Sequence, residues 1–183
     1  MLNRSQKADR PAESAQGLYT AIMARARESV FYVDFAVADT NDGRFDLLAL
    51  HAALVMEALR VRGPSGAKLG TELATAIFAG FDDALRELGV GDFGISRRIK
   101  ALADAFYGRL HAYGAAQTEA ELAPVVVRNL YRGAESRGRE AAALAHYAAA
   151  LAHYIVSVRQ KLRHEPSLLQ GSVAFGSLPR LSV

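Results

Sequence analysis

Residues 69–94 read LGTELATAIFAGFDDALRELGVGDFG, and this stretch decides the predicted fold. Apolar side chains recur in it every three or four residues, which is the spacing of one face of an α-helix. The members of this stripe are Leu69, Leu73, Ile77, Phe81, Leu85 and Leu88. Gly89 follows at the position where a left-handed residue often ends a helix, and Val90 can complete such a cap. The stretch therefore predicts a long amphipathic helix that ends at a glycine.

Helical spacing continues on both sides of this stretch. The first predicted helix covers residues 12–27, and the second follows the turn DTNDG at 39–43 and ends at 62–66. The helix quoted above comes third, and a fourth starts near Ser96. A capping box at 118–121 opens the fifth, and the sixth covers residues 136–164 and is stopped by Pro166. Pro124 fits best near the start of its helix, so the first turn of that helix is undecided.

Residues 29–38 differ from their surroundings because they are aromatic and β-branched. A lone strand would have no partner in an otherwise helical chain, so we expect a buried extended link or a distorted helix here. The fold class that follows is all-α, a compact multi-helix bundle of about six helices with a short extended link near residues 29–38.

The length of 183 residues suits one domain. We expect a flexible N-terminus over 1–11, a single helical domain over 12–165 and a loosely packed C-terminal tail over 166–183. Half of the residues are apolar, 51%, and 22% are charged, which is typical of a globular protein. Cysteine is absent, which excludes disulfides and thiolate metal sites.

Two features bear on membranes and charge. The N-terminal residues lack the apolar run of a signal peptide. Residues 141–158 carry no formal charge, but they are rich in alanine and include two histidines, so we expect a helix buried by its neighbours. Residues 1–94 have a net charge of −3 and residues 95–164 have a net charge of +6, so the second half of the chain could favour an anionic partner.

Each apparent motif for a metal or a nucleotide lacks a feature that its function requires. Residues 89–94, GVGDFG, match the dinucleotide pattern, but a helix enters the turn where a strand is needed. Residues 39–43 resemble the start of a calcium loop, but Leu50 stands where a glutamate is required. His146 and His153 are spaced too widely for a typical metal pair on one helix. We therefore predict no enzymatic activity, no catalytic residue, no metal and no cofactor.

A basic cluster lies near the predicted helix start at Ser96. It consists of Arg97, Arg98 and Lys100, with Tyr107 and Arg109 further along the same helix. Positive charge at a helix N-terminus works against the helix dipole, so local stability does not explain the cluster well. Such a surface could contact RNA phosphates or an acidic protein, although a solvated helix face is the simpler interpretation.

Several segments together resemble the ubiquinol–cytochrome c chaperone family. They are Phe31-Tyr32, residues 39–45 DTNDGRF with Leu50-His51, residues 85–92 LRELGVGD, Lys100, residues 105–109 AFYGR with Tyr113, and Arg128-Asn129. Their order and spacing are similar to the family across about residues 18–165. The sequence departs from the family pattern near Ser96, where a proline is expected, and the tail after Pro166 is not covered.

The resemblance implies an all-helical assembly chaperone for the respiratory cytochrome bc complex (complex III), with newly made cytochrome b or another apolar membrane protein as its client. It implies a bacterial member that is cytoplasmic or peripheral at the inner membrane, with transient membrane proximity, a ribosome contact as an open option and no DNA partner. The alternatives are an RNA- or ribosome-binding helical module and a haem- or isoprenoid-binding helical protein. The candidate client- or partner-binding residues are Asp42, Arg44, His51, Arg86, Asp92, Arg97, Arg98, Lys100, Tyr107 and Arg109.

Overall fold

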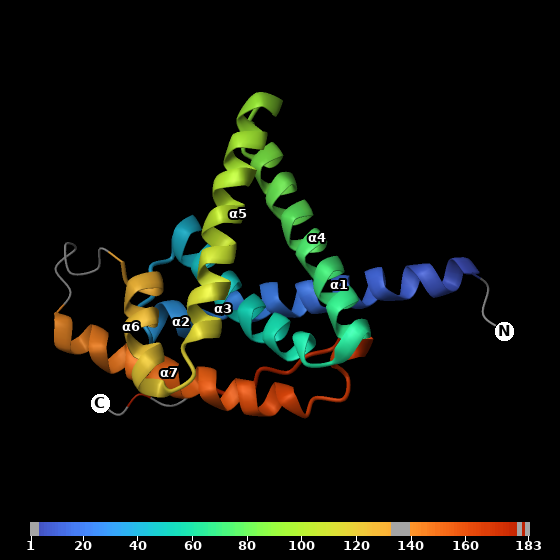
Figure 1. Cartoon of the computed structure of the whole chain (residues 1–183). Helices are drawn as coiled ribbons and strands as arrows, with labels where there is room; N and C mark the ends of the chain where they lie inside the picture. The colour runs from blue at the N-terminus through green and yellow to red at the C-terminus, as the bar shows by residue number, and fades with distance from the viewer. Residues whose placement is uncertain (1–3, 133–139, 179–180, 182–183) are drawn as a thin grey trace.

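The protein is described here by a computed structural model that covers residues 4–132, 140–178 and 181. Within these residues the chain forms α-helices and one short 3-10 helix, without strands (Figure 1). The elements are α1 (Arg4–Ala26), α2 (Ser29–Val33), α3 (Asn41–Arg60), α4 (Gly63–Glu87), α5 (Asp92–Ala115), α6 (Glu119–Leu130), α7 (Ala141–Arg163) and η2 (Leu168–Gln170). The predicted all-α fold is confirmed.

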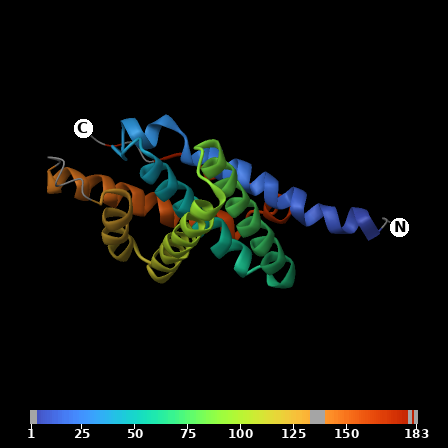
Figure 2. The same cartoon turned by 90° about the horizontal axis from the view of Figure 1, so that it is seen from above.

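Helix α3 lies at the centre of the molecule. It packs against α1, α4, α5, α6 and α7. Its side chains are apolar almost all the way round, and Leu47, Leu50 and Leu54 are fully buried. A helix that is apolar on every side is stable only when other helices surround it. In Figures 1 and 2, α7 runs along the base of the molecule with α6 packed on it, and α1 crosses to reach α4.

Helices α4 and α5 form an arm that leaves this body and turns at residues 88–91 (Figure 1). Gly89 has a φ of 74°, and its N–H donates to the Arg86 carbonyl at 2.9 Å. The N–H of Val90 donates to the Leu85 carbonyl at 3.1 Å. These two bonds make the Schellman cap that the sequence predicts at Gly89.

Helix α5 begins at Asp92, four residues earlier than the predicted start at Ser96. The carbonyl of Gly91 accepts hydrogen bonds from the N–H groups of Gly94 and Ile95, at 2.8 and 3.1 Å, which starts the helix without a side-chain cap. The basic cluster of Arg97, Arg98 and Lys100 therefore lies in the second turn of α5 and beyond, away from the unpaired N–H groups at the helix start.

An aromatic cluster fixes the arm to the start of α3. The rings of Phe78 and Phe81 on α4 lie 5.7 and 6.4 Å from the ring of Phe106 on α5. Phe81 also lies 5.7 Å from Phe45 on α3, between ring centroids. Phe106 is fully buried in this cluster. Edge-to-face and tilted ring pairs of this kind add to the stability gained by burial.

Three local structures differ from the sequence-based expectation. Residues 29–33 form the one-turn helix α2, so the extended part of the expected link is confined to the residues that follow it. Helix α1 begins at Arg4 instead of near residue 12. Pro124 lies in the middle of α6, where Ala120 and Pro124 are exposed and water can satisfy the carbonyl that proline leaves free. The start of the last predicted helix, 136–139, lies outside the described residues, and α7 begins at Ala141.

The C-terminal tail packs more closely than expected. Leu168 is fully buried in η2, which contacts α1 and α4. Phe175 is buried against His51, with 5.0 Å between the ring centroids. Gly171, with a φ of 85°, lies directly against the backbone of Ser14 on α1. Apolar side chains at positions 168 and 175 are far enough apart in the chain to anchor the tail at two places on the core.

Candidate functional site

The residues predicted from the sequence do not form one surface. Arg97 and Arg109 are twelve positions apart on α5, a separation of roughly 18 Å along a straight helix. Arg97, Arg98 and Lys100 are all exposed near the turn of the arm. Asp42 lies instead in the first turn of α3. The structure thus divides the predicted residues between the arm and the body.

At the turn of the arm, Arg86 joins the two helices. Its guanidinium donates to Asp82 at 2.7 Å and to Asp92 at 3.0 Å, so it links the end of α4 to the start of α5. The hydrogen bonds that Arg86 donates to Asp82 and Asp92 raise the pKa of Arg86 above its ordinary value. Arg86 and Asp92 are thus partners of each other, which gives them a structural role as well as an exposed position.

Arg109 is buried rather than presented to a client. Its guanidinium is 11% exposed and donates to Asp46 on α3, which is 2% exposed. Arg132 donates to the other oxygen of Asp46 at 3.0 Å. Burial raises the pKa of Asp46 above its ordinary value, and the two arginines offset part of that rise. The Arg109 side chain is engaged in this ion pair and is mostly covered, so a contact between Arg109 and a client stays a prediction.

His51 is a core residue. Its Nδ1 lies 2.7 Å from the Leu47 carbonyl, and its Nε2 lies 3.0 Å from the hydroxyl of Tyr154 on α7. Burial lowers the pKa of His51 to about 3, so the ring is neutral at physiological pH. His51 is therefore a hydrogen-bonded core histidine, and its full burial removes it from the surface on which the sequence placed it as a partner-binding candidate.

The other three candidates also lie on the surface of the body and the arm. Arg44 is exposed and pairs with Asp39 at 2.8 Å. Asp42 is exposed and lies 3.7 Å from Arg132. The side chain of Tyr107 is 51% exposed, and its ring lies 5.9 Å from that of Phe78. Tyr107 thus presents one edge of the aromatic cluster to solvent.

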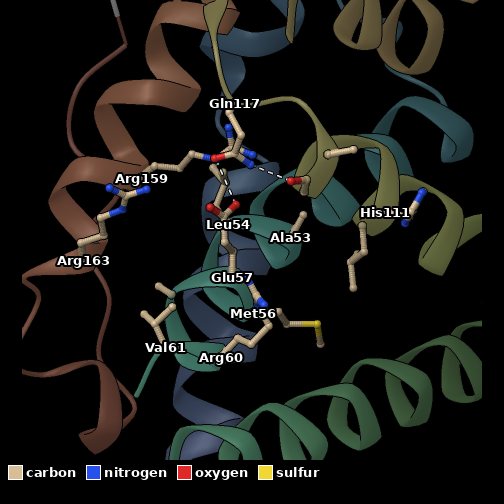
Figure 3. Close-up of a pocket in the computed structure, with 14 residues that line it drawn as sticks. Ala53, Leu54, Met56, Glu57, Arg60, Val61, His111, Gln117, Arg159 and Arg163 are labelled. Carbon is tan, nitrogen blue, oxygen red and sulfur yellow. Dashed lines mark hydrogen bonds and ion pairs between the residues drawn. The ribbon is translucent and has the colours of Figure 1, made fainter. Parts of the chain in front are cut away.

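One surface hollow is a groove that sequence reasoning missed. It has a volume of about 790 Å³ and lies between α3, α5 and α7 (Figure 3). One wall is the C-terminal half of α3, including Met56, with Val61 directly after the helix. The opposite wall is the last two turns of α5, including Leu110 and Gly114. Side chains of α7 complete it. Most of these lining residues are apolar or small.

Arg159 closes one end of the groove. Its guanidinium donates to the carbonyls of Tyr113 and Ala116 at the end of α5, at 2.5 and 2.7 Å, and to Glu57 at 3.0 Å. A cation at these carbonyls stabilises the C-terminal end of α5. Figure 3 shows Arg159 reaching across the groove toward Glu57. This arrangement holds α3, α5 and α7 apart at a fixed spacing.

The groove was not predictable because its walls come from distant parts of the chain. Glu57 and Arg159 are more than one hundred residues apart in the sequence. A weak local signal exists in Val61, an apolar residue that is 64% exposed just after α3 ends. In a single sequence, one exposed valine does not indicate a site.

Two further features concern metal binding and membrane contact. In the part of the chain that the structure describes, no group of three histidine, aspartate or glutamate side chains is placed to hold a metal ion. Helix α7 is long and apolar enough by composition to cross a membrane, and its residues from Leu144 to Leu162 on one face are buried in the fold. A core helix passes the same compositional test.

Comparisons with known proteins complete the description of this chain. A family profile described as Ubiquinol-cytochrome C chaperone matches residues 33–167. The crystal structure of the Cbp3 homolog from Brucella abortus is similar, with 32% sequence identity, a TM-score of 0.80 and 97% of each chain covered. A comparison with curated proteins found no match.

Proposed function

This chain belongs to the ubiquinol–cytochrome C chaperone family, and from that premise we propose that it binds newly made cytochrome b and assists assembly of the respiratory cytochrome bc complex. A chaperone acts by binding, and it needs a surface that accepts apolar segments of its client. It works from the cytosolic side and meets the inner membrane only through its client.

The observation that carries this proposal is the groove between α3, α5 and α7. Exposed apolar hollows with a polar rim are typical of sites that receive an apolar partner. Met56 adds an adaptable side chain, which suits a site that binds different apolar sequences.

A second candidate function rests on a separate surface. Arg97, Arg98 and Lys100 are exposed on the arm, and none has an ion-pair partner among the described residues. This cluster favours contact with an anionic partner such as the ribosome. The two functions are compatible because the cluster and the groove occupy different parts of α5.

The test uses a strain that lacks this protein. We expect its membranes to contain less cytochrome b and less assembled cytochrome bc complex, while other respiratory complexes are spared, because an unprotected apolar client aggregates or is degraded. Normal cytochrome b in the deletion strain would show that the proposed function is wrong.

Complementation with two matched variants tests the groove itself. Gly114→Leu places a side chain in the groove, and no atom lies within 4 Å of the added Cβ position. Gly108→Leu makes the same change on the same helix, also into open space and outside the groove. Leucine favours a helix more than glycine does, so both variants should fold. We expect Gly108→Leu to restore cytochrome b and Gly114→Leu to fail.

A further inference from the structure

We infer that the groove selects an apolar helical segment that carries an acidic residue at one end, and that Arg60 and Arg163 bind this acidic residue. The inference rests on the proposed function of the groove as a client-binding site. It adds the chemical character of the segment and its direction in the groove. It follows from three observations about the end of the groove where α3 and α7 finish.

The first observation is that the structure holds the two arginines at the same end. Arg60 is the last residue of α3, and Arg163 is the last residue of α7. Between them, Nη2 of Arg62 donates to the carbonyls of Leu162, Arg163 and Glu165, at 2.9, 3.1 and 3.0 Å. These bonds tie the end of α7 to Arg62, two residues after the end of α3. Figure 3 shows Arg60 and Arg163 on either side of Val61.

The second observation is that neither arginine has an acidic partner among the residues that the structure describes. Both side chains line the groove and are exposed, and no carboxylate of the described residues pairs with them. A basic residue in the last turn of a helix can serve the helix dipole. At α7, however, Arg62 already occupies the terminal carbonyls, so this role does not account for Arg163.

The third observation is that the acidic side chain in the lining of the groove is already paired. Its one acidic lining residue is Glu57, whose carboxylate is bound by Arg159 at 3.0 Å. The end formed by Arg60 and Arg163 is therefore positive, and the walls beyond it are apolar or small. An apolar segment that ends in a carboxylate complements both parts. Small wall residues such as Gly114 allow the backbone of a docked helix to approach closely.

The test uses the full-length protein and three labelled helical peptides of alanine and leucine. The peptides share a polar solubilising tail and differ only at the opposite end, which carries two Glu, two Gln or two Lys. Binding is measured by fluorescence anisotropy at low and high salt. We expect the Glu peptide to bind about five- to tenfold tighter than the Gln peptide at low salt, and the Lys peptide to bind most weakly. High salt should reduce the difference.

Charge reversal provides the control. Arg60→Glu combined with Arg163→Glu should shift the preference to the Lys peptide. Arg97→Glu combined with Arg98→Glu makes the same change of net charge on the arm and should keep the preference for the Glu peptide. Equal affinities for the three peptides, or a preference that the arm variant also loses, would overturn the inference.

Two further outcomes separate this inference from the proposed function. Gly114→Leu should weaken the binding of all three peptides to the same extent. If the peptides bind the Gly114→Leu variant as tightly as the wild type, the groove is not the client site, whatever the charge preference of the peptides. If no peptide binds but phosphatidylglycerol vesicles bind in an Arg60- and Arg163-dependent manner, the site belongs to an anionic lipid and the inference is wrong. The cellular level of cytochrome b tests the chaperone role independently of either result.

Discussion

The guanidinium of Arg109 on α5 lies 2.5 Å from the carboxylate of Asp46 on α3, and this pair joins the arm to the central helix. Arg109 also lies over the ring of Phe45, with 4.9 Å from its central carbon to the ring centroid. Arg132, which follows α6, binds the second oxygen of Asp46. One buried carboxylate therefore connects three parts of the fold.

Removing this carboxylate should destabilise the protein strongly. Asp46→Ala would leave Arg109 largely buried without its counter-charge, and breaking one half of a buried pair costs about 3–5 kcal/mol of the free energy of unfolding. Urea denaturation measures this loss. Asp39→Ala is the matched control, because Asp39 and Arg44 are both more than half exposed and such pairs contribute about 1 kcal/mol or less. Similar losses for the two variants would contradict the structural role of Asp46.

Arg109 illustrates what the sequence could not reveal. Its position near Tyr107 and the basic cluster suggested a surface residue, because the spacing along α5 is local information. Its partner, Asp46, is 63 residues away in the sequence, and nothing in either segment identifies the pair. The candidate groove was missed for the same reason, since its walls come from three separated helices.

The stability of the protein should fall as the pH is lowered, partly because of His51. In the folded state burial lowers the pKa of His51 to about 3, whereas an unfolded histidine has its ordinary pKa of 6.5. Below pH 6.5 His51 binds a proton in the unfolded chain but stays neutral in the folded chain. His51 therefore contributes full stability above pH 6.5, and this contribution declines toward pH 3 by up to about 1.4 kcal/mol per pH unit.

His51→Gln separates this effect from other titrations. The variant should be less stable at pH 7.5, because it loses the packing of His51 against Phe31 and Phe175. Its free energy of unfolding should nevertheless change less steeply between pH 6.5 and 4.5 than that of the wild type. Urea titrations at several pH values give both slopes. Parallel curves would mean that His51 takes up a proton in the folded state.

The helices and their caps were predictable because the signals are local. The stripe from Leu69 to Leu88, the cap at Gly89 and the N-cap at Thr40, whose hydroxyl accepts from the Gly43 N–H at 3.2 Å, all depend on residues a few positions apart. The tail was not predictable in this way. Its two anchors, Leu168 and Phe175, are buried by residues far away in the chain.

Gly171→Ala should test the packing of the tail. A Cβ at Gly171 would overlap the backbone of Ser14, and the φ of 85° disfavours any side chain. Gly176→Ala is the control, because its φ of 80° gives similar strain but only the flexible amine of Lys161 is near. We expect Gly176→Ala to cost about 1–2 kcal/mol and Gly171→Ala to cost clearly more. Thermal unfolding compares them, and equal melting temperatures would indicate a tail that does not pack on α1.

The aromatic cluster should respond very differently to changes at two adjacent positions. Phe106 is fully buried, so Phe106→Ala should leave a cavity and cost about 3–5 kcal/mol of stability. Tyr107 is half exposed, so Tyr107→Ala should cost about 1 kcal/mol. In cells, we expect Tyr107→Ala to be present at normal levels, which allows its effect on cytochrome b to be measured. A large stability loss for Tyr107→Ala would assign its ring to the core.

Reversing the charge of Arg97, Arg98 and Lys100 should weaken a partner contact without unfolding the protein. The three side chains are exposed in the second turn of α5 and beyond, and none pairs with an acidic residue among those described. Exposed charges contribute about 1 kcal/mol or less each, so the melting temperature of the triple glutamate variant should stay close to that of the wild type.

If the cluster contacts ribosomal RNA, co-sedimentation with ribosomes should fall for the variant, and binding of the wild type should fall steeply with salt. Arg60→Glu combined with Arg163→Glu serves as the charge control, since these residues lie at the groove. If the triple variant binds ribosomes as the wild type does, the cluster is only a solvated helix face. If its melting temperature falls strongly, the three residues contribute to the packing of the arm.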